Sequence, residues 1–263
     1  VPGSSGTGGP TPGPATSSVG VVARHDDLDG KPVLSFRDVD VKFGTEFGEV
    51  HAVKGVTFDV KPGEVVALVG ESGSGKSVTS ATAMGLLPSN ADITGSVKLA
   101  GREVLTMTPG QLRGIRGDDV AMVFQEPMTA LNPLMTIGDQ VAEALRVHGR
   151  APGGRVMELL HGVGLPDPAR VARSHPHQLS GGQRQRAWLA LVLAQQTPVV
   201  LLDEPTSYLD LSHQVEVLDL VRALPDPRGG GRATVVAVLH ELNLAARAAD
   251  RVIAMAGGRI VAA

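Results

Sequence analysis

The chain has 263 residues, which is enough to bury a sizeable core in one large domain or two small ones. Its formal net charge of −3 provides no overall positive field for recruiting nucleic acid, and its lack of cysteine excludes disulfides, thiolate zinc sites and iron–sulfur clusters. A hydrophobic content of 42% and a charged content of 19% are those of a globular protein, and no apolar run reaches the roughly 18 residues that a membrane-spanning helix needs.

The first 32 residues form a segment rich in proline, glycine, serine and threonine. Such a composition buries too little apolar surface to fold, so residues 1–32 are predicted to be a disordered tail before a folded domain over residues 33–263. Residues 33–43 and 51–60 then read as strands, and Phe47-Gly48-Glu49 between them resembles a hairpin turn. Short strands around Gly95 and Gly101 follow in residues 93–104, so an antiparallel β layer is expected here.

A glycine-rich segment with one lysine follows the apolar residues 64–69, which are predicted to form a buried strand. It fits the phosphate-binding loop pattern, and the proline-free residues 78–87 after it are expected to be helical. In such a loop, backbone N–H groups attract phosphate, the lysine reaches the β- and γ-phosphates, and the serine ligates Mg²⁺. A chance lysine in a glycine turn is the alternative. The predicted nucleotide-binding residues here are Gly70, Glu71, Ser72, Gly73, Ser74, Gly75, Lys76, Ser77 and Val78.

The middle of the chain, about residues 108–180, is predicted to be a helical subdomain inserted between two parts of an α/β core. Its clearest helix is residues 137–148, and a second helix over residues 155–163 follows a Pro-Gly break. After this subdomain, helices over residues 181–194, 212–223 and 242–249 alternate with apolar strands over residues 199–202, 234–239 and 251–256. Because strands separated by helices pair in parallel, the predicted fold class is α/β: a phosphate-loop ATPase core with a mostly parallel sheet, an antiparallel β subdomain and the inserted helical subdomain.

Two carboxylates end the strand predicted over residues 199–202. In nucleoside-triphosphate hydrolases of this architecture, the first carboxylate, here Asp203, holds Mg²⁺, and the second, here Glu204, polarises the attacking water. An ordinary acidic turn is the alternative, and the presence of the phosphate loop favours the interpretation as a metal ligand and a base.

A second glycine segment, Leu179-Ser180-Gly181-Gly182-Gln183, opens the helix predicted from residue 181. It offers a hydroxyl and glycine N–H groups at a helix start, which suits a phosphate. Because one nucleotide does not need two such nests from one chain, the natural use is in trans, on the nucleotide of a second subunit. A serine N-cap followed by flexible glycines explains the segment equally well.

Two further polar side chains follow apolar runs, of which only residues 234–239 are predicted to be a strand. His240 follows residues 234–239, where its imidazole could reach a γ-phosphate, and Gln125 follows residues 120–124, where its amide could meet Mg²⁺ or the attacking water. Alone, a histidine at a strand end is more often structural and a glutamine is usually a surface residue, so both assignments depend on the motifs around them.

The order of these motifs, with Ser207-Tyr208-Leu209-Asp210 between Glu204 and His240, resembles the ATP-binding-cassette superfamily over about residues 34–261. The resemblance implies that the chain binds ATP and Mg²⁺. In the family's arrangement, metal ligation would fall to Ser77, Gln125 and Asp203. The catalytic residues would be Lys76, Gln125, Glu204 and His240.

The resemblance also implies a dimer in which two subunits pack head to tail with two ATP molecules between them. Asp210 would lie in the loop that links the two sites across the dimer. An aromatic residue stacks on adenine in the family, and Phe43 fits best, ahead of Phe47 and His51. The residues that would close on the partner subunit's ATP are Ser180, Gly181, Gly182 and Gln183.

Within the superfamily, the two halves of the chain resemble different branches. Residues 50–53, 70–77 and 124–133 look like oligopeptide, dipeptide and nickel importers, whereas residues 183–190, 207–214 and 240–245 look more like iron–siderophore importers. An unusual lineage and a recombined chain joined between about residues 149 and 177 both explain this difference. In the family, the segment after Gln125 and the helical subdomain dock the membrane subunits, so the resemblance favours peptide cargo.

The sequence therefore predicts the ATP-hydrolysing subunit of a membrane importer, peripheral on the cytoplasmic face of the membrane. Its expected partners are a second nucleotide-binding subunit, transmembrane permease subunits and, indirectly, an extracytoplasmic substrate-binding protein. No nucleic-acid partner is expected. Two alternatives stay open: a soluble cassette ATPase that acts in nucleic-acid repair or translation, and a chimeric cassette with impaired activity.

Overall fold

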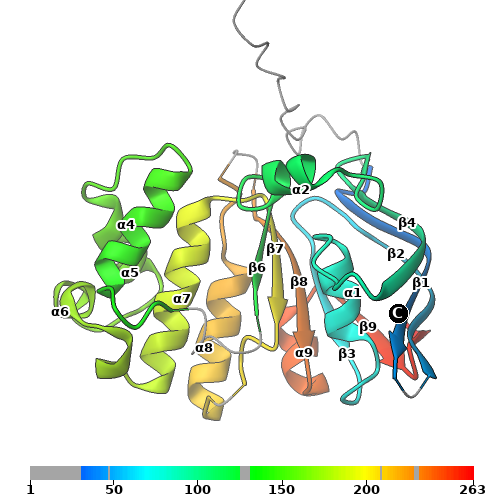
Figure 1. Ribbon diagram of the computed structural model, residues 1–263. Coiled ribbons are helices and arrows are strands. Elements are labelled where there is room, and N and C mark those ends of the chain that lie inside the picture. Colours follow the sequence, from blue (N-terminus) through cyan, green and yellow to red (C-terminus); the bar gives the residue numbers. More distant parts are fainter. Residues whose placement is uncertain (1–30, 47, 125–130, 208, 228–230) are drawn as a thin grey trace, which may run out of the picture.

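The computed structural model describes residues 31–46, 48–124, 131–207, 209–227 and 231–263. Residues 1–30 of the predicted tail, together with Phe47, Gln125 and Tyr208, lie outside these ranges. Figure 1 shows the described chain in three parts: helices at the left, a sheet in the centre and a strongly curved antiparallel layer at the right. These parts correspond to the fold class that the sequence predicts.

The antiparallel layer is a four-stranded sheet in the order β2-β1-β4-β5. Its strands are β1 (Leu34–Thr45), β2 (Gly48–Val60), β4 (Ala91–Leu99) and β5 (Arg102–Glu103). Phe36 pairs with Phe58 across β1 and β2, and their rings stack with centroids 4.5 Å apart. The apolar face of this layer packs against core-sheet residues such as Val66 and Leu68, so the two sheets share one hydrophobic core.

Two details of this layer differ from the expectation. Gly48 and Glu49 were expected in the hairpin turn, but they already belong to β2 and pair with Thr45 and Gly44 of β1. Strand β4 runs unbroken through Gly95, which has φ +95°. A Cβ atom at Gly95 would lie 2.4 Å from the carbonyl oxygen of Asp38, so close backbone approach requires glycine there, and the glycine marks no strand end.

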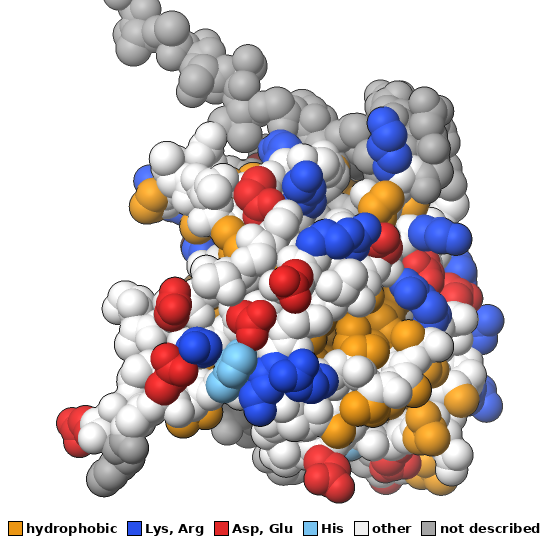
Figure 2. Space-filling model, turned by 90° about the vertical axis from the view of Figure 1, so that its right-hand side faces the viewer, with side chains coloured by type: hydrophobic (Ala, Val, Ile, Leu, Met, Phe, Trp, Pro, Cys, Tyr) orange, Lys and Arg blue, Asp and Glu red, His pale blue; other side chains and the backbone are white. Residues whose placement is uncertain are grey.

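Figure 2 shows the side of the molecule that this layer forms. Basic and acidic side chains are intermixed across the face, with apolar side chains between them. Two ion pairs of β1 with β2 illustrate the mixture: Arg37 with Asp59 at 2.7 Å and Lys42 with Glu49 at 3.0 Å. In both pairs, opposite charges of neighbouring strands lie next to each other.

The core sheet has six strands in the order β10-β9-β3-β8-β7-β6. The strands are β3 (Val65–Val69), β6 (Val120–Val123), β7 (Val199–Asp203), β8 (Thr234–Leu239), β9 (Arg251–Ala256) and β10 (Arg259–Ala262). All but β10 pair in parallel, and every residue of β3, β6, β7 and β8 is buried, as expected for a sheet covered on both faces. The register places Val69 opposite Leu239 and Asp203 opposite Val238, so three strands end at one edge.

Strand β6 was not expected inside the helical region. The structure has only the short helix α2 (Pro109–Ile115) there, capped by Thr108, before β6 joins the core sheet beside β7. A four-residue apolar strand that is buried on both faces has the same periodicity signal as a buried helix segment, which explains the error. The helices that make up the left-hand part of Figure 1 therefore begin after β6, not at residue 108.

That left-hand part contains α4 (Ile137–Val147), α5 (Arg155–Gly162), α6 (Pro168–Arg173) and the 3-10 turn η2 (Pro176–Gln178). Helices α4 and α5 pack against the longer α7 (Gly181–Gln195), in which Trp188 is buried, and α6 packs against α4 and α5. Ile137, Val141 and Leu145 form the buried side of α4, as their spacing predicts. The remaining helices are α1 (Lys76–Thr82), shorter than predicted because the chain turns at Gly85, α8 (Leu211–Arg222) and α9 (Leu242–Ala248). Within the described residues, no helix combines the length and the apolar character that a membrane crossing requires.

Candidate functional site

The glycine-rich loop connects the end of β3 to the start of α1, as its sequence pattern predicts. Gly70 has φ +151° and Gly75 has φ +95°. A Cβ atom would lie 2.1 Å from the Met255 carbonyl oxygen at Gly70 and 2.6 Å from the Ala52 carbonyl oxygen at Gly75. Both glycines are therefore required by the path of the backbone. The loop is buried along Ser74, Gly75 and Lys76 and exposed along Glu71, Ser72 and Gly73, with Ser77 and Val78 half-buried.

Lys76 is folded back over this loop and is only 4% exposed. Its ammonium group donates hydrogen bonds to the carbonyl oxygens of Gly70 (2.9 Å) and Glu71 (2.7 Å) and to the hydroxyl of Ser74 (3.3 Å). Burial lowers the pKa of Lys76 below its usual value, an effect that the carboxylates of Glu204 and Asp203 partly oppose. A cation held at a glycine loop in front of a helix start is suited to a polyphosphate.

Ser77 and Asp203 meet although they are far apart in the sequence. The Ser77 hydroxyl donates to Oδ1 of Asp203 at 2.7 Å, and Asp203 is 7% exposed at the end of β7. Burial raises the pKa of Asp203 above its ordinary value, while the hydrogen bond from Ser77 acts in the opposite direction. Mg²⁺ commonly takes one or two protein oxygens and completes its shell with water and substrate phosphates, so this hydroxyl–carboxylate pair beside the phosphate loop fits it.

Glu204 and His240, each predicted to be catalytic, meet at the ends of β7 and β8. The Nε2 atom of His240 lies 2.6 Å from Oε1 of Glu204, and the Ser207 hydroxyl donates to Oε2 at 3.0 Å. The Glu204 side chain is 10% exposed and the His240 side chain 45%. Glu204 has φ +51°, an uncommon conformation for a residue that is not glycine. A pocket of about 170 Å³ lies beside this pair and is lined also by Thr206.

The segment that begins α7 forms a capping box. The Ser180 hydroxyl accepts from the Gln183 backbone N–H at 3.2 Å, and the Gln183 side-chain oxygen accepts from the Ser180 N–H at 3.1 Å. Gly181 is exposed and Gly182 half-buried. The alternative of a serine N-cap is therefore right for the single chain, and within the described residues no hydrogen bond joins this segment to the phosphate loop.

Asp210 also caps a helix, α8. Its carboxylate accepts from the His213 backbone N–H (3.0 Å) and the Ser212 hydroxyl (2.7 Å), and both oxygens lie 2.7 Å from Nδ1 of His213. These hydrogen bonds, the backbone one first, hold the pKa of Asp210 well below its ordinary range. The sequence interpretation assigned no role to Ser207 or His213. The only signal was their spacing, three residues after Glu204 and three after Asp210.

The remaining predicted residues are less informative. Phe43 pairs with Val50 and Ala91 in the antiparallel sheet and is half-buried against the core, so part of its ring is used in packing. His51 pairs with Asp40 at 2.6 Å. Gln125 and Phe47 lie outside the described residues, and their assignments stay predictions.

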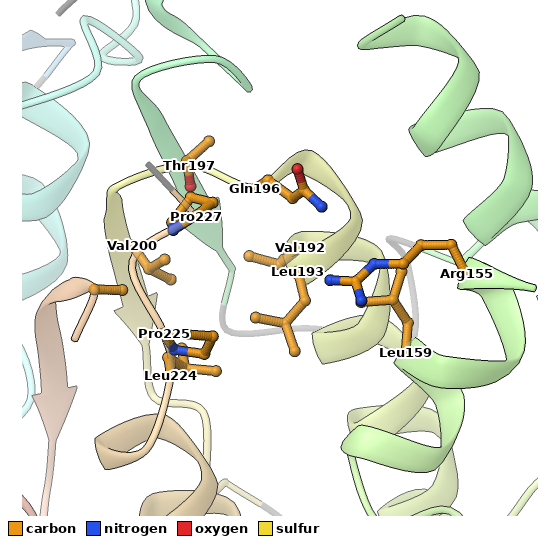
Figure 3. A pocket seen from close by; sticks show the side chains of 11 residues that line it. Arg155, Leu159, Val192, Leu193, Gln196, Thr197, Val200, Leu224, Pro225 and Pro227 are labelled. Atoms are coloured by element: carbon orange, nitrogen blue, oxygen red, sulfur yellow. The ribbon is translucent and has the colours of Figure 1, made fainter. Parts of the chain in front are cut away.

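A separate pocket of about 220 Å³ lies at the other end of β7 (Figure 3). Val200 and Thr197 at the amino end of that strand line it, whereas Asp203 and Glu204 are at the carboxyl end. In Figure 3 the guanidinium group of Arg155 extends from α5 towards Leu193 of α7. This pocket is distinct from the cluster around the phosphate loop.

Comparison with known proteins agrees with this geometry. The family described as ABC transporter matches residues 53–207. The chain is 43% identical over 235 residues to the oligopeptide transport ATP-binding protein OppD of Mycobacterium tuberculosis, which covers 88% of this chain and 38% of that protein. It is 42% identical to the dipeptide transport ATP-binding protein DppD of Bacillus subtilis, covering 87% of this chain and 69% of the relative. The chain thus spans well under half the length of OppD.

Among solved structures, the dimeric structure of MJ0796, a bacterial ABC transporter cassette, superposes with a TM-score of 0.76 at 30% identity, covering 87% of this chain and 97% of that one. A second structure of the same cassette, described as a dimeric post-hydrolysis state bound to ADP and Pi, gives the same values. The family match, the relatives and the phosphate-loop geometry agree: the chain belongs to the ABC transporter family as one of its ATP-binding cassettes.

Proposed function

We propose that this chain is the ATP-hydrolysing subunit of an ABC importer for peptides. The observation that carries the proposal is the meeting of two carboxylates with the phosphate loop. Asp203 accepts from Ser77 of the loop, and the adjacent Glu204 pairs with His240 from the neighbouring strand. Lys76, the cation beside them, is buried with its charge directed at the loop.

Glu204 is the general base of the proposed hydrolysis. An ionised carboxylate has about four lone-pair sites, so Glu204 can accept a proton from water while His240 and Ser207 hold its two oxygens. The oxygen of that water forms a bond to the γ-phosphorus, and the bond from this phosphorus to the β-bridging oxygen breaks. ADP and inorganic phosphate are the products, and the proton rests first on Glu204.

Lys76 compensates charge in this step. Its ammonium group leaves carbonyl oxygens of the loop for the β- and γ-phosphates, so a buried cation gains an anionic partner. Ser77 and Asp203 would hold Mg²⁺, which when bound draws charge from the phosphate oxygens. Gln125 remains a candidate for orienting the metal or the water.

A second subunit completes each site in this proposal. The turn is accessible, because Ser180 and Gly181 are exposed and Gly182 is half-buried. In the part of the chain that the structure describes, its hydrogen bonds are local to the start of α7 and do not join it to the phosphate loop of the same chain, so it suits the nucleotide of a partner. The dimeric assembly of the similar MJ0796 cassette supports this arrangement. ATP binding would close the dimer and hydrolysis would reopen it.

The transported cargo is inferred from the relatives. OppD and DppD are described as oligopeptide and dipeptide transport proteins, and both alignments cover nearly nine-tenths of this chain. A peptide importer therefore fits better than a nickel or iron–siderophore importer. The chain would dock on permease subunits at the cytoplasmic face of the membrane. Two exposed apolar side chains beside residues 125–130, Phe124 and Leu134, are candidates for that contact.

The direct test is Glu204→Gln, which keeps the size of the side chain and removes the base. ATP hydrolysis should fall by about 10²–10⁴-fold, while ATP affinity changes little and an ATP-dependent dimer accumulates on size-exclusion chromatography. Glu143→Gln is the matched control, because this glutamate is exposed on α4 and does not line the pocket beside Glu204 and His240. If Glu204→Gln hydrolysed ATP at the parent's rate, the assignment of the base would be wrong.

A further inference from the structure

The loop that ends at Asp210 and the turn that begins at Ser180 are connected in this structure through one side chain, His213. Its Nδ1 atom lies 2.7 Å from both oxygens of Asp210. The other side of the ring lies against Gly182. A Cβ atom placed on Gly182 would be 3.4 Å from Cδ2 of His213 and 3.8 Å from Nε2. The imidazole therefore lies between the capping carboxylate of α8 and the first turn of α7, and leaves room for one methyl group at Gly182.

A second connection lies one turn further along the same two helices, which run side by side in Figure 1. Arg186 of α7 pairs with Glu216 of α8, and its guanidinium group also donates to the carbonyl oxygen of Gly164 at 2.6 Å. The spacing matches, because Arg186 is four residues after Gly182 and Glu216 is three residues after His213. His213 and Arg186 thus occupy successive positions along one junction.

The junction is hollowed beside the Arg186–Glu216 pair. A pocket of about 380 Å³ lies there, lined by Val163, Gly164, Arg186, Glu216 and their neighbours. Where apolar packing is interrupted in this way, the orientation of α7 relative to α8 depends more on the specific side chains that span the gap. His213 lies outside this pocket and is the side chain of this junction nearest to Ser180.

We propose that His213 is a positioning residue that couples the Asp210 loop to the Ser180–Gln183 turn. The inference rests on the proposed function, in which the Ser180 turn acts on the nucleotide of a second subunit, and on the expected place of Asp210 in the loop that links the two sites of the dimer. With His213 in place, a displacement of Asp210 is transmitted towards Gly182 through a ring that is bonded to Asp210 and lies beside Gly182. Without it, the two segments move independently, and a partner nucleotide has to order them separately.

Three substitutions separate the two contacts of the ring. His213→Asn retains an N–H near the position of Nδ1 and loses the contact with Gly182. His213→Phe retains the ring and loses the hydrogen bond to Asp210. His213→Ala loses both. His161→Ala is the control, since His161 is an exposed histidine of α5 whose side chain makes no hydrogen bond or ion pair within the described residues.

The first measurement is amide hydrogen exchange in residues 181–186 of the full chain, which needs no catalytic activity. His213→Ala loses both the hydrogen bond to Asp210 and the ring beside Gly182, and should speed exchange by about 3–10-fold. The increase should be smaller in His213→Asn and His213→Phe and absent in His161→Ala. Asp210→Ser, which keeps a capping oxygen, should speed exchange in the parent and add nothing in the His213→Ala background. Unchanged exchange in His213→Ala, or additive effects with Asp210→Ser, would overturn the proposal.

The second measurement distinguishes positioning from general stability. His213→Ala should lower ATP turnover by about 3–10-fold and raise the protein concentration for half-maximal activity, with ATP affinity of the monomer and Tm close to the parent's. A matching loss of ATP affinity or a large drop in Tm would mean that His213 is merely structural. If the parent itself neither hydrolyses ATP nor dimerises, the proposed function fails, while the exchange data still decide whether His213 couples the two segments.

Discussion

The phosphate-loop cluster and the Ser180–Asp210 surface differ in how complete each is within one chain. Around the loop, Lys76 and Asp203 are almost fully buried, and their polar atoms have partners within the site: Lys76 bonds to carbonyl oxygens of the loop and Asp203 to Ser77 of α1. At the surface, Ser180 and Asp210 are exposed and use their oxygens to cap their own helices. The first region is preorganised by folding, whereas the second keeps backbone and hydroxyl groups in reach of another molecule. This difference is what a site shared between two subunits requires.

Complementation between two variants tests this comparison most severely. Lys76→Ala disables the loop, and Ser180→Asp retains a capping side chain while placing a negative charge where a partner phosphate would bind. Each alone should lose about 10²-fold or more of the ATPase activity, because each removes or opposes a preorganised charge contact.

The ATPase activity of a mixture of the two variants then tests whether each site is shared between two subunits. Randomly mixed head-to-tail dimers would contain one intact site in half of the molecules, so about a quarter of the parent activity should return. Mixing either variant with buffer alone is the control. A mixture as inactive as its components would mean that each chain carries a complete site or that no dimer forms.

Asp203→Asn separates function from stability in the buried region. The raised pKa of Asp203 means that burial opposes its charged form. The contribution of Asp203 to the free energy of unfolding therefore falls as the pH rises from about 4 towards neutrality. The amide still accepts from Ser77 and carries no charge. We expect Mg²⁺-dependent ATPase activity to fall by about 10²-fold or more and the Tm at neutral pH to rise by about 2–4 °C. A lower Tm would show that Asp203 contributes to the fold through its charge.

Two glycine substitutions compare how tightly the backbone is constrained in the phosphate loop and in the turn that begins α7. Gly75→Ala forces a Cβ atom to within 2.6 Å of the Ala52 carbonyl oxygen at φ +95°, and should destabilise the fold by at least about 1–2 kcal/mol. Gly181→Ala meets nothing within 4 Å in a helical turn and should stabilise α7 by up to about 1 kcal/mol. Urea unfolding of both variants measures the difference. Equal losses would mean that the surface turn is as constrained as the loop.

The smallest effect is the pH dependence of the Asp210 cap. The pKa of Asp210 is lowered in the folded chain, so its contribution is fully present above the ordinary carboxyl pKa of about 4 and is lost only as the pH falls well below it. The stability gap between the parent and Asp210→Ala should therefore stay constant from neutral pH to about 4 and narrow in stronger acid. A gap that closes near pH 5 would contradict the capping geometry.

The sequence was informative wherever local chemistry determines the backbone. The loop from Gly70 to Ser77, the end of β7 at Asp203 and the start of α7 at Gly181 lie where the motifs predict them. Strand β6 was missed because its neighbours in the sheet, not its own pattern, make it a strand. The positive φ of Glu204 and the contact of His213 with Gly182 arise from tertiary packing, and no spacing rule encodes them.

Trp188 is the only tryptophan of the chain and lies buried in α7, within two turns of Gly182. Its indole is therefore a fluorophore that the protein carries without labelling, fixed to the helix whose first turn would meet a partner nucleotide. A change in the packing of α7 should alter the emission of this one ring. Titration with ATP or with a second subunit can then be followed optically in the unmodified protein.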